Sequence, residues 1–210
     1  MIIAVDGPAA SGKGTIAKAL ARHYDLPHLD TGLLYRAVGL NLLQWGGDPE
    51  SEFAAVRACD FAQTDFDDPE LKSETVGGIA SRISAYPLVR AALADRQRDF
   101  AGQAGGAVLD GRDIGTVIAP HADAKLFVTA APEVRAHRRL EELIRMGLQV
   151  HYEDVLLDIQ ARDARDSGRA AAPLIRADDA HLLDTSAIGI DQAVADAIAA
   201  VERRRVAGRP

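Results

Sequence analysis

The chain has 210 residues, 48% apolar and 26% charged, which is typical of a soluble globular protein of one domain. Its net charge of −7 disfavours a protein that coats nucleic acid, and its apolar runs are too short to cross a membrane. Cys59 is the single cysteine, which excludes an intrachain disulfide. Because Asp6 and Gly7 follow Met1–Val5 directly, no signal peptide is indicated, and we expect a cytoplasmic monomer without nucleic-acid or membrane partners.

Short apolar segments alternate with helical patterns along the chain. The apolar segments predict strands at Ile2–Asp6, His28–Asp30, Ala107–Asp110, Ala124–Val128 and His181–Leu183. The helical patterns lie at about Gly14–Tyr24, Thr31–Trp45, Leu88–Phe100, Pro132–Met146, Tyr152–Asp166 and Ile190–Arg204. This alternation predicts an α/β fold in which helices cover both faces of a parallel sheet. Asp60–Gly78 is the least regular stretch, and its fold is left unassigned.

The segment GPAASGK after the first strand fits the pattern G-x-x-x-x-G-K. Its glycines let backbone N–H groups curve around phosphate oxygens, and Lys13 adds a mobile cation. A chance turn is the alternative, but the strand before it and the helix after it favour a phosphate-binding loop. Gly14 follows the lysine and Thr15 comes next, one residue later than the usual hydroxyl ligand of magnesium. We therefore assign no direct metal ligand.

Three classes of protein use such a loop. A GTP-dependent switch normally reads guanine with N-K-x-D, whereas Asn41, the single asparagine, begins NLLQ. A motor or transport ATPase needs further domains, for which 210 residues leave little room. A small-molecule kinase needs a second anion site and a cover that excludes water.

Further motifs are candidates for the second anion site and for the cover. LDTGLLYR places Tyr35 and Arg36 in the first turns of a helix, although a plain N-cap with a solvated arginine is the alternative. LDGRDIGT places Asp110, Arg112 and Asp113 after a buried strand, where open α/β sheets bind ligands; a surface turn is the weaker alternative. The arginines cluster late in the chain, in the groups Arg135, Arg138, Arg139, Arg145 and Arg162, Arg165, Arg169, Arg176.

RDARDSGR is an arginine-rich segment at the end of a predicted helix. Arg162, Arg165, Asp166 and Arg169 share an arc of about 100°, with Asp163 at its edge. A salt-bridged surface would pair Arg162 with Asp166, but it leaves the other arginines without a second acid. This surplus of arginine favours a lid that closes on phosphates.

Together, DGPAASGKGT, LDTGLLYR, YPLVRAALADRQRDF, LDGRDIGT, RAHRR and RDARDSGRAAAPL resemble the bacterial cytidylate kinase family over nearly the whole chain. The resemblance implies a P-loop nucleoside monophosphate kinase fold, with a five-stranded parallel sheet between helical layers. It implies one kinase domain, 1–210: a core (1–30, 101–146, 174–210), a monophosphate-binding region (about 31–100) and a mobile lid (about 147–173). Bacterial members typically carry a small β-sheet insert, whereas about Cys59–Gly78 is too short for it, so we expect a shortened insert.

The resemblance also implies the activity, in which ATP and Mg²⁺ convert CMP and dCMP to CDP and dCDP in pyrimidine metabolism. For ATP it implies the loop residues Gly7, Pro8, Ala9, Ala10, Ser11, Gly12, Lys13, Gly14 and Thr15. For CMP it implies Thr31, Tyr35, Arg36, Ser81, Arg90, Arg112, Asp113, Arg162, Asp166 and Arg169. Lys13, Arg139 and Arg165 are the catalytic candidates. Thr15 and Asp110 are candidates for the outer shell of Mg²⁺, and a structural role for Asp110 remains open. Another small-molecule kinase (for UMP, AMP or shikimate) and a non-catalytic nucleotide-binding module are the alternatives.

We predict that Lys13→Ala nearly abolishes turnover and leaves the fold intact, because the lysine contributes charge at the transferring phosphoryl group. Steady-state kinetics with a far-UV circular dichroism control measures both effects. A variant that keeps more than about a tenth of the wild-type kcat has lost less than ~1.4 kcal/mol of transition-state stabilisation, which would contradict the assignment of the loop.

Overall fold

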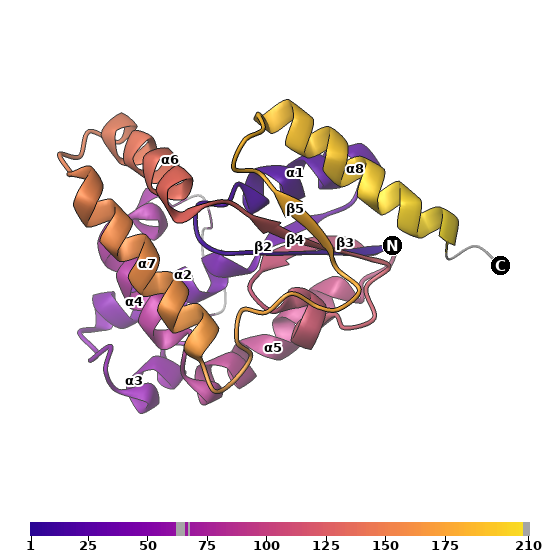
Figure 1. Ribbon diagram of the computed structural model, residues 1–210. Helices are drawn as coiled ribbons and strands as arrows, with labels where there is room; N and C mark the ends of the chain where they lie inside the picture. Colours follow the sequence, from indigo (N-terminus) through magenta and orange to yellow (C-terminus); the bar gives the residue numbers. More distant parts are fainter. Residues whose placement is uncertain (62–65, 67, 208–210) are drawn as a thin grey trace. The chain divides into compact units, whose positions relative to one another are not determined.

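Five strands form one sheet in the order β2-β3-β1-β4-β5 (Figure 1). They are β1 (Ile2–Asp6), β2 (His28–Asp30), β3 (Ala107–Gly111), β4 (Ala124–Thr129) and β5 (His181–Asp184). The central strand β1 pairs in parallel with β3 and β4, and β4 pairs in parallel with β5. Every strand begins where the sequence predicts, so the α/β fold with a five-stranded parallel sheet is confirmed.

The computed structural model describes residues 1–61, 66 and 68–207. They form two compact units, one of Asp30–Phe100 and one that joins Met1–Leu29 to the chain from Ala101 onward. The smaller unit has nearly the bounds of the expected monophosphate-binding region, and that function stays a prediction.

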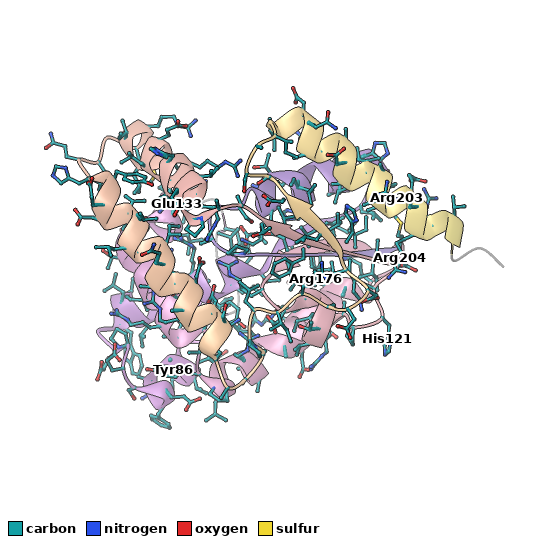
Figure 2. All side chains as sticks on the ribbon, in the orientation of Figure 1. Tyr86, His121, Glu133, Arg176, Arg203 and Arg204 are labelled. Atoms are coloured by element: carbon teal, nitrogen blue, oxygen red, sulfur yellow. The ribbon has the colours of Figure 1, made fainter. Side chains whose placement is uncertain are left out.

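Among its described residues, the larger unit contains the α-helices α1 (Lys13–Tyr24), α6 (Pro132–Arg145), α7 (Tyr152–Gly168) and α8 (Ile190–Ala207). Helices α1 and α8 lie on the same face of the sheet (Figure 1) and bury Leu20 and Val201 in one core with Val128 of β4. Arg204 of α8, labelled in Figure 2, donates to the Asp179 carbonyl at 2.7 Å. None of the described helices is long and apolar enough to span a membrane.

Helices α6 and α7 pack against each other. Leu143 of α6 and Val155 of α7 are buried in a small cluster of their own. The rings of His137 and Tyr152 stack at 4.4 Å between centroids. Both helices therefore have a shared apolar contact that is separate from the sheet core.

The smaller unit is helical. It contains α2 (Thr31–Trp45), α3 (Glu52–Arg57), the 3₁₀ turn η1 (Pro69–Lys72), α4 (Glu74–Ile83) and most of α5 (Pro87–Ala101). Asp30 caps α2, as the N-cap alternative for LDTGLLYR requires, because its carboxylate accepts a hydrogen bond from the Gly32 N–H at 2.9 Å. Gly39 lets α2 and α4 approach closely, since a Cβ there would lie 3.2 Å from Cγ2 of Ile79.

The second half of Asp60–Gly78, whose fold the sequence left unassigned, is helical. Ser73 caps α4 by accepting from the Val76 N–H at 3.2 Å, and α4 then packs on α2. Its two glycines weaken the helical pattern in the sequence, and packing stabilises it in the fold. Residues 62–65 and 67 of the expected insert lie outside the described residues, and its described part contains no strand.

Candidate active site

The phosphate-binding loop connects β1 to α1. Gly12 caps α1 with a left-handed φ of 88°, and Ala10 is also left-handed with a φ of 57°. Gly7 must be glycine, because a Cβ there would overlap the carbonyl oxygen of Val128. The Ser11 hydroxyl is buried and has no hydrogen-bond partner among the described residues. Since buried polar groups normally have partners, this hydroxyl fits a ligand-binding loop.

All nine predicted ATP residues, Gly7 to Thr15, lie on this loop and the first turn of α1. The Lys13 ammonium donates to the Pro8 carbonyl at 3.3 Å. Thr15 is exposed. The α1 N-terminus and Lys13 therefore present positive charge at one place, which suits an anion.

Asp110 of β3 reaches the start of α1. Its carboxylate is buried, accepts a 2.7 Å hydrogen bond from Nε2 of His28, and lies 3.7 Å from where a Cβ of Gly14 would be. No motif in the sequence indicates His28, because a single histidine in a short strand is more often a packing residue. The described residues contain no cluster of three or more His, Cys, Asp or Glu side chains that could hold a metal. Mg²⁺ commonly takes one or two carboxylates together with substrate phosphates and water, so Asp110 beside the loop fits that ion.

Asp6, the last residue of β1, anchors the segment that follows β3. Its buried carboxylate accepts hydrogen bonds from the N–H groups of Ile114 and Gly115, both at 2.8 Å. These two residues begin a π-helical turn, η2 (Ile114–Ile118), and buried Asp113 directly precedes it. Burial raises the pKa of Asp6 to about 6, although the two backbone N–H groups oppose this effect. The sequence indicated Asp113 but not the contact that fixes its position.

Asp166 of α7 brings several predicted site residues together. Nε of Arg112 donates to its carboxylate at 2.7 Å, and Nη1 of Arg169 lies 3.9 Å from it. Burial alone would raise the pKa of Asp166, but the charges of Arg112, Arg169 and Lys13 lower it below the ordinary value. One carboxylate thus stands among three cations, an arrangement with a net positive charge that suits phosphate groups.

A salt-bridged surface of α7 would pair Arg162 with Asp166, whereas each of these side chains forms an ion pair with another described residue. The structure pairs Arg162 with Asp158 at 2.7 Å, one turn earlier, while Asp166 contacts Arg112. Asp163 also has a partner, Arg135 of α6, which donates two hydrogen bonds to it at 2.9 and 2.5 Å. Each of these carboxylates offsets a cation, and Asp163 and Asp166 do so for arginines that lie outside α7.

The two remaining catalytic candidates lie on α6 and α7. Arg139 donates to Glu142 on its own helix at 2.6 Å, and Arg165 is exposed on α7. Neither the ion pair of Arg139 nor the exposure of Arg165 indicates a catalytic role by itself. Arg135, which the sequence did not assign, is instead 3% exposed and also donates to the Ala9 carbonyl of the phosphate loop at 3.3 Å.

The other predicted CMP residues belong to the smaller unit. Arg90 donates to the Ser84 carbonyl at 3.2 Å and lies over the ring of Tyr35, 5.8 Å from its centroid. The Ser84 hydroxyl in turn donates to the Ser81 carbonyl at 2.9 Å, so Tyr35, Ser81 and Arg90 belong to one chain of contacts. Arg36 donates to the Leu71 carbonyl at 2.6 Å. Thr31 is buried at the start of α2.

Comparisons with known proteins agree with this arrangement. The family model for cytidylate kinase matches residues 3–203. The chain belongs to the cytidylate kinase family. A cytidylate kinase of Xanthobacter autotrophicus is 62% identical over 212 residues, covering 100% of both chains. A second, from Caulobacter sp. strain K31, is 56% identical over 205 residues and covers 97% of this chain and 95% of its own.

Solved structures share the fold of this cytidylate kinase family member. An uncharacterized protein from Eubacterium ventriosum has a TM-score of 0.57 at 15% identity, covering 96% of this chain and 98% of its own. A gluconokinase from Sinorhizobium meliloti has a TM-score of 0.52 at 17% identity, covering 96% and 91%. At this identity the likeness concerns the fold alone.

The raised pKa of Asp6 predicts a pH-dependent difference in stability between the wild type and Asp6→Asn. Between about pH 4 and 6 the folded wild type keeps a proton that the unfolded chain has lost, so its free energy of unfolding falls as the pH rises. Asn cannot ionise and lacks this slope. The stability of the wild type relative to the variant should therefore decrease from pH 4 to 6 and stay constant above. Urea unfolding of both proteins across this range measures it, and a constant difference would contradict the raised pKa.

Proposed function

We propose that the chain transfers the γ-phosphoryl group of ATP to CMP and dCMP, forming CDP and dCDP, with Mg²⁺. The observation that carries the proposal is full-length similarity to cytidylate kinases, at 62% identity for the Xanthobacter protein. The phosphate loop and the cations around Asp166 supply the chemistry that such a reaction needs. The reaction belongs to pyrimidine nucleotide metabolism, and we propose that it takes place in the cytoplasm, with a monomeric enzyme.

On the donor side, we propose that Lys13 and the backbone from Gly7 to Thr15 hold ATP. Backbone N–H groups and a helix N-terminus bind phosphate without any change in protonation. The buried Ser11 hydroxyl is available as a further hydrogen-bond donor. Mg²⁺, when bound, would neutralise charge on the donor phosphates, and Asp110, together with Thr15, is our candidate for its outer shell.

On the acceptor side, we propose that Thr31, Tyr35, Arg36 and Arg112 surround the phosphate of CMP. Ser81, Arg90, Asp113 and Arg169 would face the cytosine, and Arg162 with Asp166 the ribose. A carboxylate such as Asp113 can accept from the exocyclic N4 amine of cytosine, while serine and arginine can donate to O2 and N3. Asp113 is buried and directly precedes η2, a position that restricts the direction of its carboxylate.

The acceptor phosphate is already an anion, so the reaction needs no general base. Catalysis then consists of alignment and of neutralising the charge on the transferring phosphoryl group. The charge of Lys13, with those of Arg112 and Arg169, lowers the pKa of Asp166, which supports a position of the Lys13 ammonium near these charges. Arg139 of α6 and Arg165 of the mobile lid (about 147–173) are the candidates for further cations, and closure of the lid over the phosphates would bring Arg165 to them.

We predict that the chain phosphorylates CMP and dCMP in preference to UMP, AMP and shikimate. An assay that couples ADP formation to a reporter, run with each acceptor in turn, measures kcat/KM for all five. Preference for another acceptor would support the alternative of a different small-molecule kinase. ATP binding without turnover of any acceptor would support a non-catalytic module instead.

We further predict that Asp113→Asn lowers the ratio of kcat/KM for CMP to that for UMP. A carboxylate only accepts hydrogen bonds, whereas an amide can also donate to O4 of uracil. We expect a change of roughly tenfold, equivalent to about one hydrogen bond to a charged group. A loss of activity with an unchanged ratio would place Asp113 in a structural or metal-related role.

A further inference from the structure

The outer side of the phosphate loop is held by side chains that come from elsewhere in the chain. Thr185, directly after β5, is 3% exposed, and its hydroxyl lies 3.0 Å from the Ser11 carbonyl and 3.1 Å from the Thr129 carbonyl. Arg138 donates to the same hydroxyl at 2.9 Å and to the Thr185 carbonyl at 2.7 Å. Arg138 belongs to α6, whose first turn is marked by Glu133 in Figure 2.

The chemistry of the side chains decides which group donates in each hydrogen bond among Arg138, Thr185 and the loop. Arginine can only donate, so the Thr185 hydroxyl accepts from Arg138 and keeps its own proton for a carbonyl. The direct distance from Arg138 to the Ser11 carbonyl is 3.5 Å, too long for a strong hydrogen bond. The hydroxyl is therefore the main link between Arg138 and the loop.

The hydrogen bond from Thr185 to the Ser11 carbonyl affects the direction in which the Gly12 N–H points. In a trans peptide the C=O and N–H groups point in opposite directions. A partner on the Ser11 carbonyl at the outer side thus turns the Gly12 N–H toward the inner side, where the phosphates of a nucleotide would lie. Gly12 also caps α1, so the same peptide sets the start of the helix.

The charge of Arg138 also favours an orientation of the Ser11–Gly12 peptide with its N–H toward the inner side of the loop. Among the described residues, the hydrogen bonds of Arg138 go to the hydroxyl and carbonyl oxygens named above and to no carboxylate. Arg135, one turn earlier, is instead neutralised by Asp163. A cation at the head of a chain of hydrogen bonds polarises each member, which strengthens the donor at the far end.

We propose that Thr185 and Arg138 are positioning residues of the phosphate loop: the Thr185 hydroxyl links the Arg138 guanidinium to the Ser11 carbonyl and fixes the Ser11–Gly12 peptide with its N–H toward the phosphates of ATP. The inference rests on the proposed function, because it requires that the loop binds ATP. It assigns both residues to the donor nucleotide and neither to the acceptor.

Thr185→Val and Thr185→Ser form the matched test. Valine keeps the size and branching of threonine but lacks the hydroxyl, whereas serine keeps the hydroxyl. We expect Thr185→Val to raise the calorimetric Kd for ATP with Mg²⁺ about three- to tenfold, the effect of one net hydrogen bond. The KM for CMP should change less than about twofold, and Thr185→Ser should bind ATP within about twofold of the wild type. An equal loss for ATP and CMP, or an equal loss in the serine variant, would overturn the proposal.

A double-mutant cycle with Arg138→Met tests the linkage. Because the two side chains act through one chain of hydrogen bonds, the double variant should bind ATP no more weakly than Arg138→Met alone, to within about twofold. Losses that add would overturn the proposal. Urea unfolding reports whether Arg138→Met folds, and if it does not, the comparison of valine with serine decides.

The same measurements separate this inference from the proposed function. A wild type that binds ATP but phosphorylates no monophosphate would refute the proposed function, and the Kd comparison would still decide the role of Thr185. An active wild type whose Kd for ATP is unchanged by Thr185→Val would refute the positioning role alone.

Discussion

Backbone N–H groups that point at a phosphate leave the carbonyl oxygens of the same peptides pointing away from it, and such carbonyls, where buried, normally have partners. Here the Pro8 carbonyl accepts from Lys13, the Ala9 carbonyl from Arg135, and the Ser11 carbonyl from Thr185. The donors come from α1, from α6 and from the end of β5, which are far apart in the sequence. The parallel sheet brings the carboxyl ends of its strands to one edge, and this edge is where the loop finds its partners.

The second constraint is the electrostatic repulsion among cations that lie close together in the site. The chain carries a net charge of −7, yet Lys13, Arg112 and Arg169 all act on Asp166. Such a group would repel itself without a carboxylate among its members, and Asp163 has the same relation to buried Arg135. Phosphates that enter the site would bring further negative charge to these cations. The carboxylates therefore allow the positive site to exist in the free protein, and they make it less positive than the arginine count suggests.

Asp6 shows how the sheet places the recognition segment. The carboxylate at the end of β1 accepts from two successive N–H groups of η2, and the residue just before that turn is Asp113. A strand end thus sets the position of a segment that begins more than 100 residues later in the chain. If Asp113 reads the base as proposed, base specificity also depends on the Asp6 carboxylate, which holds η2 in place.

The sequence by itself determined the strands, most helices, the phosphate loop and the family. Each of these depends on local or linear signals: an apolar run before GPAASGK, a cap at Asp30, and motifs in a fixed order. It did not determine α4, because its two glycines hide a helix that packing on α2 stabilises. It did not determine the partner of Asp166, since spacing on one helix cannot reveal that Arg112 approaches from the segment after β3. His28, Arg135, Arg138 and Thr185 carry no motif of their own. Only the tertiary structure gives them a part in the site, because hydrogen bonds between distant segments depend on which strand ends the fold brings together.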